Sequence, residues 1–259
     1  MLTGASDPAP TRSDGDVSQR APDALRRSYD AVADAYAAEL FGELPGKPVD
    51  RALYRLFAEL VRDDLDAGMA TGAAPRVGDV GCGPGHVTAY LHDLGLDAVG
   101  VDVSPAMVAE AKRRVPEAEF RIGSMTDVGG LGEPDAAWAG AISAYSIVHF
   151  DTDQRRRAFA ELARAIRTDG WLLVSFHIEN AEQQPGTVAH VTDWWGRVVD
   201  LDFHFLDPDA VTADLADAGF ALVSRTDREP WPGREAPTRR SHLVARRIPR
   251  PRAGAEHRA

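Results

Sequence analysis

The chain has 259 residues, 44% of them hydrophobic and 27% charged, a composition typical of globular domains. Its single cysteine, Cys82, excludes an intrachain disulfide and any metal site built from several cysteines. The 40 acidic and 29 basic residues give a net charge of −11, which disfavours a nucleic-acid partner. Because no apolar run is long enough for a membrane span and no signal peptide is apparent, a cytoplasmic location is the default expectation.

The N-terminal part predicts a disordered leader followed by two helices. Residues 1–22 are rich in Pro, Ser, Asp and Ala and have no periodicity, so we expect them to be disordered. Apolar residues at spacings of three and four predict one helix from Pro22 to Leu40 and a second from Val49 to Leu65. We assign 23–68 to a helical lid in front of the main domain.

From Pro75 onward, short apolar runs alternate with helical patterns. Strands are predicted at 76–80, 97–103, 118–123, 136–145 and 170–178, and helices at 86–94, 105–115 and 154–166. This alternation is typical of right-handed crossovers and a parallel sheet covered by helices. The remaining segments are predicted as a half-exposed strand at 199–206, a helix at 208–218, and a final antiparallel pair of strands at 220–229 and 239–247.

Three glycines stand at alternate positions where the first predicted strand meets a helix, in Asp79-Val80-Gly81-Cys82-Gly83-Pro84-Gly85-His86. Glycine permits a sharp turn there and lets a ligand approach without meeting a Cβ atom. The helix start behind the glycines offers free N–H groups. A dinucleotide fingerprint would read G-x-G-x-x-G, but its sixth position is His86 here, which disfavours a nicotinamide or flavin cofactor.

Asp102 ends the next predicted strand. In doubly wound folds, an acidic residue at about this distance from the glycine loop binds the ribose hydroxyls of a nucleotide. Met107, in the helix that follows, is suitably placed to lie against a flat base. The alternative is that Asp102 only caps that helix, although Ser104 is better placed to do so.

Taken in order, these segments resemble the class I S-adenosylmethionine-dependent methyltransferases. The matching stretches are DVGCGPGHV, GVDVSPAMVAEA, FRIGSMTDV, AISAYSIVHF and FAELARAIRTDGWLLVSFH. The resemblance covers Pro75 to Ile178 and implies an α/β fold with a Rossmann-like, doubly wound seven-stranded sheet that ends in an antiparallel hairpin. It also implies S-adenosyl-L-methionine as cofactor and S-adenosyl-L-homocysteine as product. We expect one domain at 23–248, with a cofactor-binding core at 75–178, a substrate-side insert at 179–206, and a disordered tail at 249–259.

The resemblance also implies roles for particular residues. The glycine loop would approach the methionine part of the cofactor with support from Asp79, Asp102 would bind the ribose, and Ser124 and Met125 would border the adenine. Two departures are Ser124, where many relatives carry Asp, and Gly78, where a bulky apolar residue is usual. The residues expected to bind the cofactor are Tyr29, Asp79, Gly81, Cys82, Gly83, Gly85, Asp102, Val103, Met107, Ser124, Met125 and Ala144.

The acceptor site should lie beyond the carboxyl ends of the strands. His149 is the first candidate for a general base, and the alternative is a structural histidine that caps the neighbouring helix. His177 and Tyr36 are further catalytic candidates, although Tyr29 and Tyr36 fit a core stripe equally well. The residues expected to bind the acceptor are Tyr145, Trp195, His204, Phe205 and Arg240.

Three of these acceptor expectations have alternatives. His204 fits a surface position on its strand at least as well. The aromatic residues of the insert, Trp194, Trp195, Phe203 and Phe205, fit either the floor of a pocket or the insert's own core. Arg240 is suited to an anionic group of the acceptor, but a solvent-facing position is the alternative.

The leading functional hypothesis is methyl transfer to a small-molecule acceptor, with a natural product as the favoured class. The alternatives are an RNA- or protein-directed methyltransferase, and a cofactor-binding cyclase that transfers no methyl group. We expect no metal site and no membrane partner, and either a monomer or a homodimer.

Overall fold

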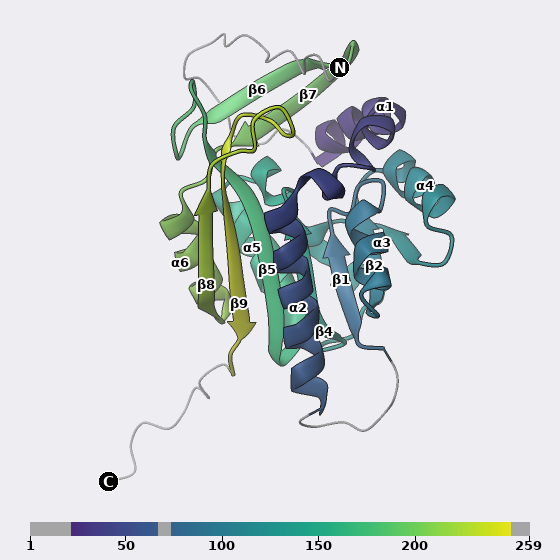
Figure 1. Cartoon of the computed structure of the whole chain (residues 1–259), viewed down its shortest axis with the longest axis vertical. Coiled ribbons are helices and arrows are strands. Elements are labelled where there is room, and N and C mark those ends of the chain that lie inside the picture. Colours follow the sequence, from purple (N-terminus) through teal and green to yellow (C-terminus); the bar gives the residue numbers. More distant parts are fainter. Residues whose placement is uncertain (1–21, 67–73, 250–259) are drawn as a thin grey trace.

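The computed structural model describes residues 22–66 and 74–249, and in these its helices and strands alternate as expected (Figure 1). The expected leader and tail lie outside the described residues, apart from Pro22 and Pro249. The helices are α1 (Pro22–Leu40), α2 (Pro48–Asp66), α3 (His86–Asp93), α4 (Pro105–Arg114), α5 (Thr152–Ala165) and α6 (Pro208–Ala218). Among the helices of the described part, none is long and apolar enough to cross a membrane.

Seven strands form one sheet in the order β3–β2–β1–β4–β5–β9–β8. They are β1 (Arg76–Val80), β2 (Asp97–Asp102), β3 (Glu119–Ile122), β4 (Trp138–Ala144), β5 (Ile166–Glu179), β8 (Phe220–Arg228) and β9 (Arg239–Arg247). The first five pair in parallel, whereas β9 pairs antiparallel with both β5 and β8. The predicted α/β fold, with its doubly wound sheet and terminal antiparallel hairpin, is therefore confirmed.

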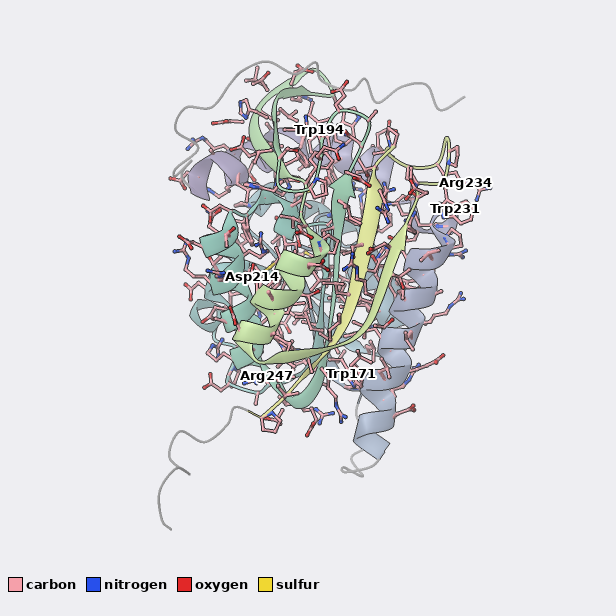
Figure 2. The ribbon with its side chains drawn as sticks, turned by 90° about the vertical axis from the view of Figure 1, so that its left-hand side faces the viewer. Trp171, Trp194, Asp214, Trp231, Arg234 and Arg247 are labelled. Atoms are coloured by element: carbon pink, nitrogen blue, oxygen red, sulfur yellow. The ribbon has the colours of Figure 1, made fainter. Side chains whose placement is uncertain are left out.

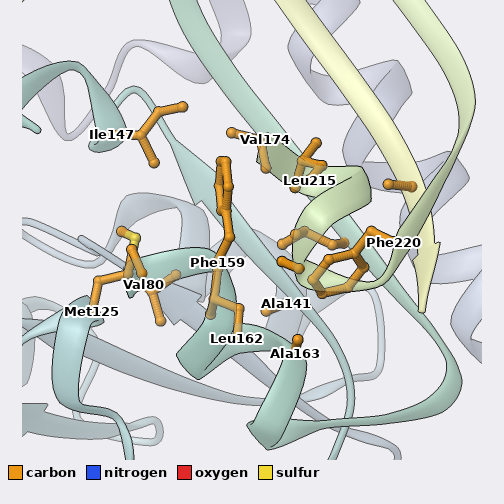
Figure 3. Packing of buried hydrophobic residues seen from close by; sticks show 14 of the residues in the cluster. Val80, Met125, Ala141, Ile147, Phe159, Leu162, Ala163, Val174, Leu215 and Phe220 are labelled. Carbon is orange, nitrogen blue, oxygen red and sulfur yellow. The ribbon is translucent and has the colours of Figure 1, made fainter. Parts of the chain in front are cut away.

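Helices cover both faces of this sheet (Figure 1). On one face, Phe159 and Leu162 of α5 point at Val80 and Val174 of the strands, with Leu215 of α6 beside them (Figure 3). On the other face, α2 and α3 bury their apolar sides against β1, β4 and β5. Burial on both faces explains why the strands read as nearly continuous apolar runs.

Gly78 has a clear packing reason. A Cβ atom at this position in β1 would lie 2.4 Å from Cζ3 of Trp138, which is fully buried. The indole of Trp138 therefore takes the volume that a larger residue at position 78 would occupy. Packing against Trp138 therefore explains why glycine stands at position 78.

The insert after β5 forms a second, two-stranded sheet of β6 (Val188–Trp194) and β7 (Arg197–His204). Only one strand, at 199–206, was predicted here, so β6 was missed. Its tight turn uses Trp195 and Gly196, both with positive φ (+52° and +71°), as a two-residue hairpin turn requires. Trp-Gly is an unusual pair for such a turn, so the sequence carried little hairpin signal.

The hairpin and α1 lie above the end of the sheet at which the parallel strands finish (Figure 1). Trp194 marks this end of the molecule in Figure 2, and Trp171 and Arg247 mark the opposite end. α1 is anchored there through Asp30, whose Oδ1 accepts hydrogen bonds from Ser104 Oγ (2.6 Å) and the Ala106 N–H (3.1 Å) at the start of α4. The expected lid helix therefore lies over the edge where a ligand would bind.

Candidate active site

The glycine loop between β1 and α3 requires glycine at each of its three alternate positions. Gly81, Gly83 and Gly85 have φ values of +77°, +51° and +87°. A Cβ on Gly81 would lie 2.3 Å from Cβ of Ser146, and one on Gly85 would lie 2.8 Å from the Phe120 ring. At Gly83 the nearest atom, in the Tyr36 ring, is 3.8 Å away, so this glycine leaves its backbone approachable.

Asp102 lies directly beside this loop. Its Oδ2 accepts the Gly83 N–H at 2.8 Å and its Oδ1 accepts the Ser104 N–H at 2.9 Å. Burial raises the pKa of this carboxyl to about 6, against the lowering effect of these two hydrogen bonds. Each oxygen keeps a further acceptor position, because a carboxylate offers about four in all. Asp102 is thus more than a helix cap, since Ser104 Oγ itself caps α4 by accepting the Met107 N–H.

Asp79 and Cys82 face the protein interior. The Asp79 Oδ2 accepts a hydrogen bond from Thr88 Oγ1 at 2.6 Å, which ties the end of β1 to α3, and burial raises its pKa to about 6. Cys82 packs with Val108 and Phe120, and burial raises the pKa of its thiol well above the usual value. The geometry of Asp79 suits support of the loop, and Cys82 contributes its backbone rather than its thiol.

The residues expected around the adenine surround the ends of β2 and β3. Val103 is half-buried beside Asp102, whereas Met107 is fully buried beneath α1. Ser124 accepts the Thr126 N–H at 3.1 Å and shares a hydrogen bond with its hydroxyl at 2.7 Å. Met125 is nearly buried in the main core. The structure thus brings these four residues close together, but the side chains of Met107 and Met125 are buried.

The aromatic residues of α1 and the hairpin form one cluster, here called the aromatic lid. The Trp194 and Trp195 rings stack at 4.7 Å, and the Tyr36 ring meets them edge-on at 5.7 and 5.9 Å. The members of the aromatic lid are Tyr29, Tyr36, Trp194, Trp195 and Phe203. The tyrosines of α1 and the aromatic residues of the β6–β7 hairpin thus form one core shared by these two segments. Phe205 is buried outside this cluster.

His149 has a partner on each ring nitrogen. Its Nδ1 lies 2.9 Å from the Asp202 carbonyl oxygen, so this nitrogen donates, and its Nε2 then accepts from Tyr29 Oη at 2.6 Å. Burial lowers the pKa of His149 to about 4 and keeps the ring neutral. His149 therefore joins the lid helix to the hairpin instead of capping α5, whose N-cap is Asp151.

A buried polar cluster lies on the far side of β4, between the start of α2 and strands β5, β9 and β8. Asp50 accepts hydrogen bonds from Tyr145 Oη and Arg228 Nη2, both at 2.7 Å. Glu235 accepts from the same Arg228 Nη2 at 3.0 Å. The members of this acceptor-side cluster are Lys47, Asp50, Tyr145, His177, Arg228, Glu235, Arg240 and His242.

Arg240 belongs to this cluster and is only 2% exposed, so the solvent-facing alternative is wrong. Its guanidinium donates to the Thr238 and Ala236 carbonyl oxygens at 2.9 and 3.0 Å and pairs with Glu235 at 3.1 Å. These partners lie in the loop between β8 and β9 and at its end. Arg240 is buried because that loop folds back over it, a feature that a local pattern does not contain.

His177 stacks on the Tyr145 ring at 5.1 Å, and its Nδ1 is 2.8 Å from Thr238 Oγ1. Burial and the nearby Arg240 lower its pKa well below the usual value, so the ring is neutral. Tyr145 has a φ of +57°, which turns the chain sharply at the end of β4 next to Ala144. His204 lies apart from this group, at the end of β7. Burial lowers its pKa, and the charges of Asp151 and Arg155 also act on that pKa.

Several members of the cluster had no sequence signal. Lys47, Asp50, Arg228, Glu235 and His242 come from five different elements or loops, and none belongs to a recognisable motif. Only their burial reveals them: Asp50 and His242 are at most 1% exposed.

A cavity of about 40 Å³ opens beside the glycine loop, between the start of α2 and the ends of β1 and β4. The residues that line it are Tyr36, Glu43, Leu44, Lys47, Asp50, Tyr54, Asp79, Gly81, His86, Val87, Ala144 and Tyr145. The cavity connects the loop with the acceptor-side cluster through Lys47, Asp50 and Tyr145. This arrangement brings a nucleotide-type loop and a polar pocket to the same edge of the sheet.

Comparison with known proteins shows what this arrangement is similar to. Residues 77–170 match the model of the methyltransferase domain family. The trans-aconitate 2-methyltransferase of Methylobacterium nodulans is 35% identical over 130 residues, 48% of each chain. The chain thus spans about half the length of the curated relatives it matches.

Solved structures with the same fold include the DhpI–SAH complex (22% identity, 88% of this chain and 98% of that one, TM-score 0.64). Magnesium protoporphyrin IX methyltransferase of Synechocystis PCC 6803 with bound SAM follows at 15% identity, 90% and 100% coverage and a TM-score of 0.62. The [4+2]-cyclase SpnF matches at 17% identity, 88% and 97% coverage and a TM-score of 0.60. Residues 77–170 are therefore similar to a methyltransferase domain, and the strand order and these neighbours show that the chain has the same fold as solved S-adenosylmethionine-dependent methyltransferases.

Proposed function

We propose that this protein transfers a methyl group from S-adenosylmethionine to a small-molecule acceptor. The observation that carries the proposal is the juxtaposition of the Gly83 N–H and the buried Asp102 carboxylate, 2.8 Å apart, at the carboxyl edge of the sheet. When bound, the cofactor supplies a methyl group already activated by a sulfonium. The task left to the protein is to bind, orient and exclude water.

The residues present suit this cofactor. The free acceptor positions of Asp102 match the two hydroxyls of a ribose, and the glycines remove the Cβ atoms that would obstruct a ligand. Val103, Ser124 and Met125 are the residues proposed to border the adenine, with Met107 beneath them. The segment 23–68 is proposed as the lid, because Tyr36 already lies against Gly83.

His177 is a better candidate for the general base than His149. Both nitrogens of His149 have partners, so it takes up a proton only if Tyr29 moves away. For His177, Nε2 has no partner among the described residues, and the tautomer that donates Nδ1–H to Thr238 leaves Nε2 free to accept a proton. Tyr36 stays protonated because burial raises its pKa, so we assign it a positioning role.

The charges of the acceptor side argue for an acceptor that is not a polyanion. Each cation has a carboxylate partner: Lys47 with Glu43 at 2.8 Å, Arg228 with Asp50 at 2.7 Å, and Arg240 with Glu235 at 3.1 Å. A tricarboxylate such as trans-aconitate, which the relatives are named for, would need unpaired positive charge. This balance of charge favours a neutral or singly charged acceptor, such as a natural product.

The cofactor assignment is tested by calorimetric titration of S-adenosylhomocysteine. We expect Asp102→Ala to weaken binding at least tenfold, because a buried carboxylate–diol contact worth about 1.4 kcal/mol or more is lost. Asp102→Asn retains one acceptor oxygen and should lose less. The matched control is Asp97→Ala, at the exposed start of β2, which should leave affinity unchanged. Unchanged affinity in Asp102→Ala would refute the assignment.

The acceptor is tested with a panel that contains trans-aconitate, neutral phenols, monocarboxylates and transfer RNA, scored by methylated product. Turnover of a neutral or singly charged compound is expected. Preferred turnover of trans-aconitate would refute the acceptor class but not methyl transfer, and RNA methylation would favour the macromolecule-directed alternative. Cofactor binding without any product would favour a non-transferring role such as that of a cyclase with this fold.

A further inference from the structure

We infer that Glu43, Lys47 and His86 form a binding site for the amino-acid end of the cofactor, its α-ammonium and α-carboxylate groups. The inference rests on the proposed cofactor and adds residues that the glycine loop does not contain. Glu43 and Lys47 flank the short 3-10 turn Leu44–Gly46, which joins the two lid helices, and His86 is the first residue of α3. Glu43 and Lys47 lie outside the matched residues 77–170.

The three side chains meet at the cavity beside the glycine loop. Lys47 Nζ lies 2.8 Å from Glu43 Oε1, and His86 Nε2 lies 3.3 Å from the same oxygen. All three line the cavity together with Gly81 and Asp79. Its volume of about 40 Å³ admits a small polar group, because about 10–15 Å³ is enough for one water molecule.

One buried polar atom at this site lacks a partner. The Nδ1 of His86 makes no hydrogen bond to any described residue, although its side chain is only 12% exposed. Burying a polar nitrogen without a hydrogen-bond partner is destabilising. A ligand that brings a donor or acceptor into the cavity would remove that cost, so the orphaned atom points to a ligand at this position.

The charges of the site match a zwitterion. Burial would raise the pKa of Glu43, but the hydrogen bond from His86 and the charge of Lys47 prevail and lower it to about 2, so the carboxylate stays ionised. Glu43 suits the α-ammonium group, and Lys47 suits the α-carboxylate, with His86 beside both. A group with one charge of each sign enters this pair without leaving a net buried charge, which a purely anionic or cationic ligand would do.

The position of this site next to the ribose contact suits a single ligand that spans both. Gly81 lines the cavity and Gly83 contacts Asp102, so the two sites are separated by one residue of the loop. Tyr36 lines the cavity and also lies against Gly83. Because Glu43 and Lys47 belong to the lid connection, contact with the amino-acid end would also hold the lid in place.

The experiment compares two ligands by calorimetry on the full chain. S-Adenosylhomocysteine carries the amino-acid group, whereas 5′-methylthioadenosine keeps the adenosine and sulfur but lacks it. We expect the wild-type protein to bind the former at least tenfold more tightly. Lys47→Met and Glu43→Gln should remove most of that preference while the affinity for 5′-methylthioadenosine changes less than twofold, and Lys47→Arg should retain it.

Controls separate the possible failures. Lys112→Met, on the exposed face of α4, should preserve the preference. Equal wild-type affinity for both ligands, or equal loss for both in Lys47→Met, would overturn the inference and leave the proposed methyl transfer standing. If neither ligand binds, the proposed cofactor itself is wrong. If the variants fail to fold, the test uses the wild-type protein with decarboxylated S-adenosylhomocysteine. We expect this compound to bind at least tenfold more weakly than S-adenosylhomocysteine.

Discussion

The two sides of the candidate active site are built in different ways. The cofactor side consists of one contiguous loop, Gly81 to Gly85, and a carboxylate, Asp102, that reaches it from the next strand. The acceptor side consists of charged residues from α2, β8, β9 and the loop between β8 and β9, and its central ion pair joins Asp50 to Arg228, 178 residues away. One side depends on backbone conformation, the other on a balanced set of buried ion pairs.

This difference determines how each side should respond to substitution. A glycine loop presents its N–H groups whatever side chains surround it. Buried ion pairs work only as a complete set, because removal of one partner leaves an uncompensated charge in the interior. We therefore expect substitutions on the acceptor side to act first on stability, and those in the loop to act through local geometry.

The largest expected effect is that of Arg228→Met. This arginine pairs with Asp50 and Glu235, which are at most 1% exposed at their side chains, so its loss should lower the free energy of unfolding by about 3–5 kcal/mol. Urea denaturation measures the change. Arg225→Met, which breaks more exposed pairs with Asp209 and Asp227, should cost about 1 kcal/mol or less. Similar costs in the two variants would show that the buried ion pairs of the acceptor side behave no differently from exposed ones.

A pH effect should follow from His149. Its pKa is about 4 in the folded protein because of burial, below its usual value of 6.5, so the unfolded chain takes up a proton that the folded chain refuses. The stability that this neutral ring contributes is present above pH 6.5 and is lost as pH falls toward 4, by about 3 kcal/mol. Unfolding free energies measured from pH 7 to 4.5 should fall less steeply in His149→Gln. The exposed His92→Gln should keep the wild-type slope.

Gly81→Ala tests the geometry of the loop. Its φ is +77°, and the new Cβ would meet Ser146 at 2.3 Å, so both strain and overlap oppose the change. Gly186→Ala is the matched control, because it has a φ of +89° but nothing within 4 Å. We expect Gly81→Ala to cost about 1–3 kcal/mol more than the control in thermal or urea unfolding. It should also weaken cofactor binding, and equal costs would show that Ser146 does not constrain the loop.

The smallest expected effect is that of Tyr29→Phe. This change deletes the hydrogen bond of 2.6 Å to His149 Nε2 and should lower stability by about 1 kcal/mol. Tyr90→Phe is its control, because the Tyr90 hydroxyl is buried without a partner among the described residues, and its removal should be neutral or stabilising. Turnover of Tyr29→Phe should stay close to that of the wild-type protein if His177 is the base, and a large loss would restore His149 to that role.

Periodicity and spacing were sufficient for most of the fold. α1 and α6 begin and end at the predicted residues, and β1 has the predicted bounds. These elements obey local rules, since apolar faces, helix starts at Pro and a C-terminal Gly219 act over a few residues. The fourth strand was predicted two residues too long at its start and one at its end, where Tyr145 leaves the strand at a φ of +57°.

The sequence by itself determined the sheet, the glycine loop and the position of Asp102, because these depend on backbone conformation and on residues close together along the chain. Only the tertiary structure decided that Arg240 is buried, that β6 exists, and that both nitrogens of His149 have partners. It also brought Lys47 and Asp50 to the same cavity as the loop. Some of these contacts join segments more than 100 residues apart, as between Asp50 and Arg228. Because their strength depends on burial in the folded protein, no local sequence pattern predicts them.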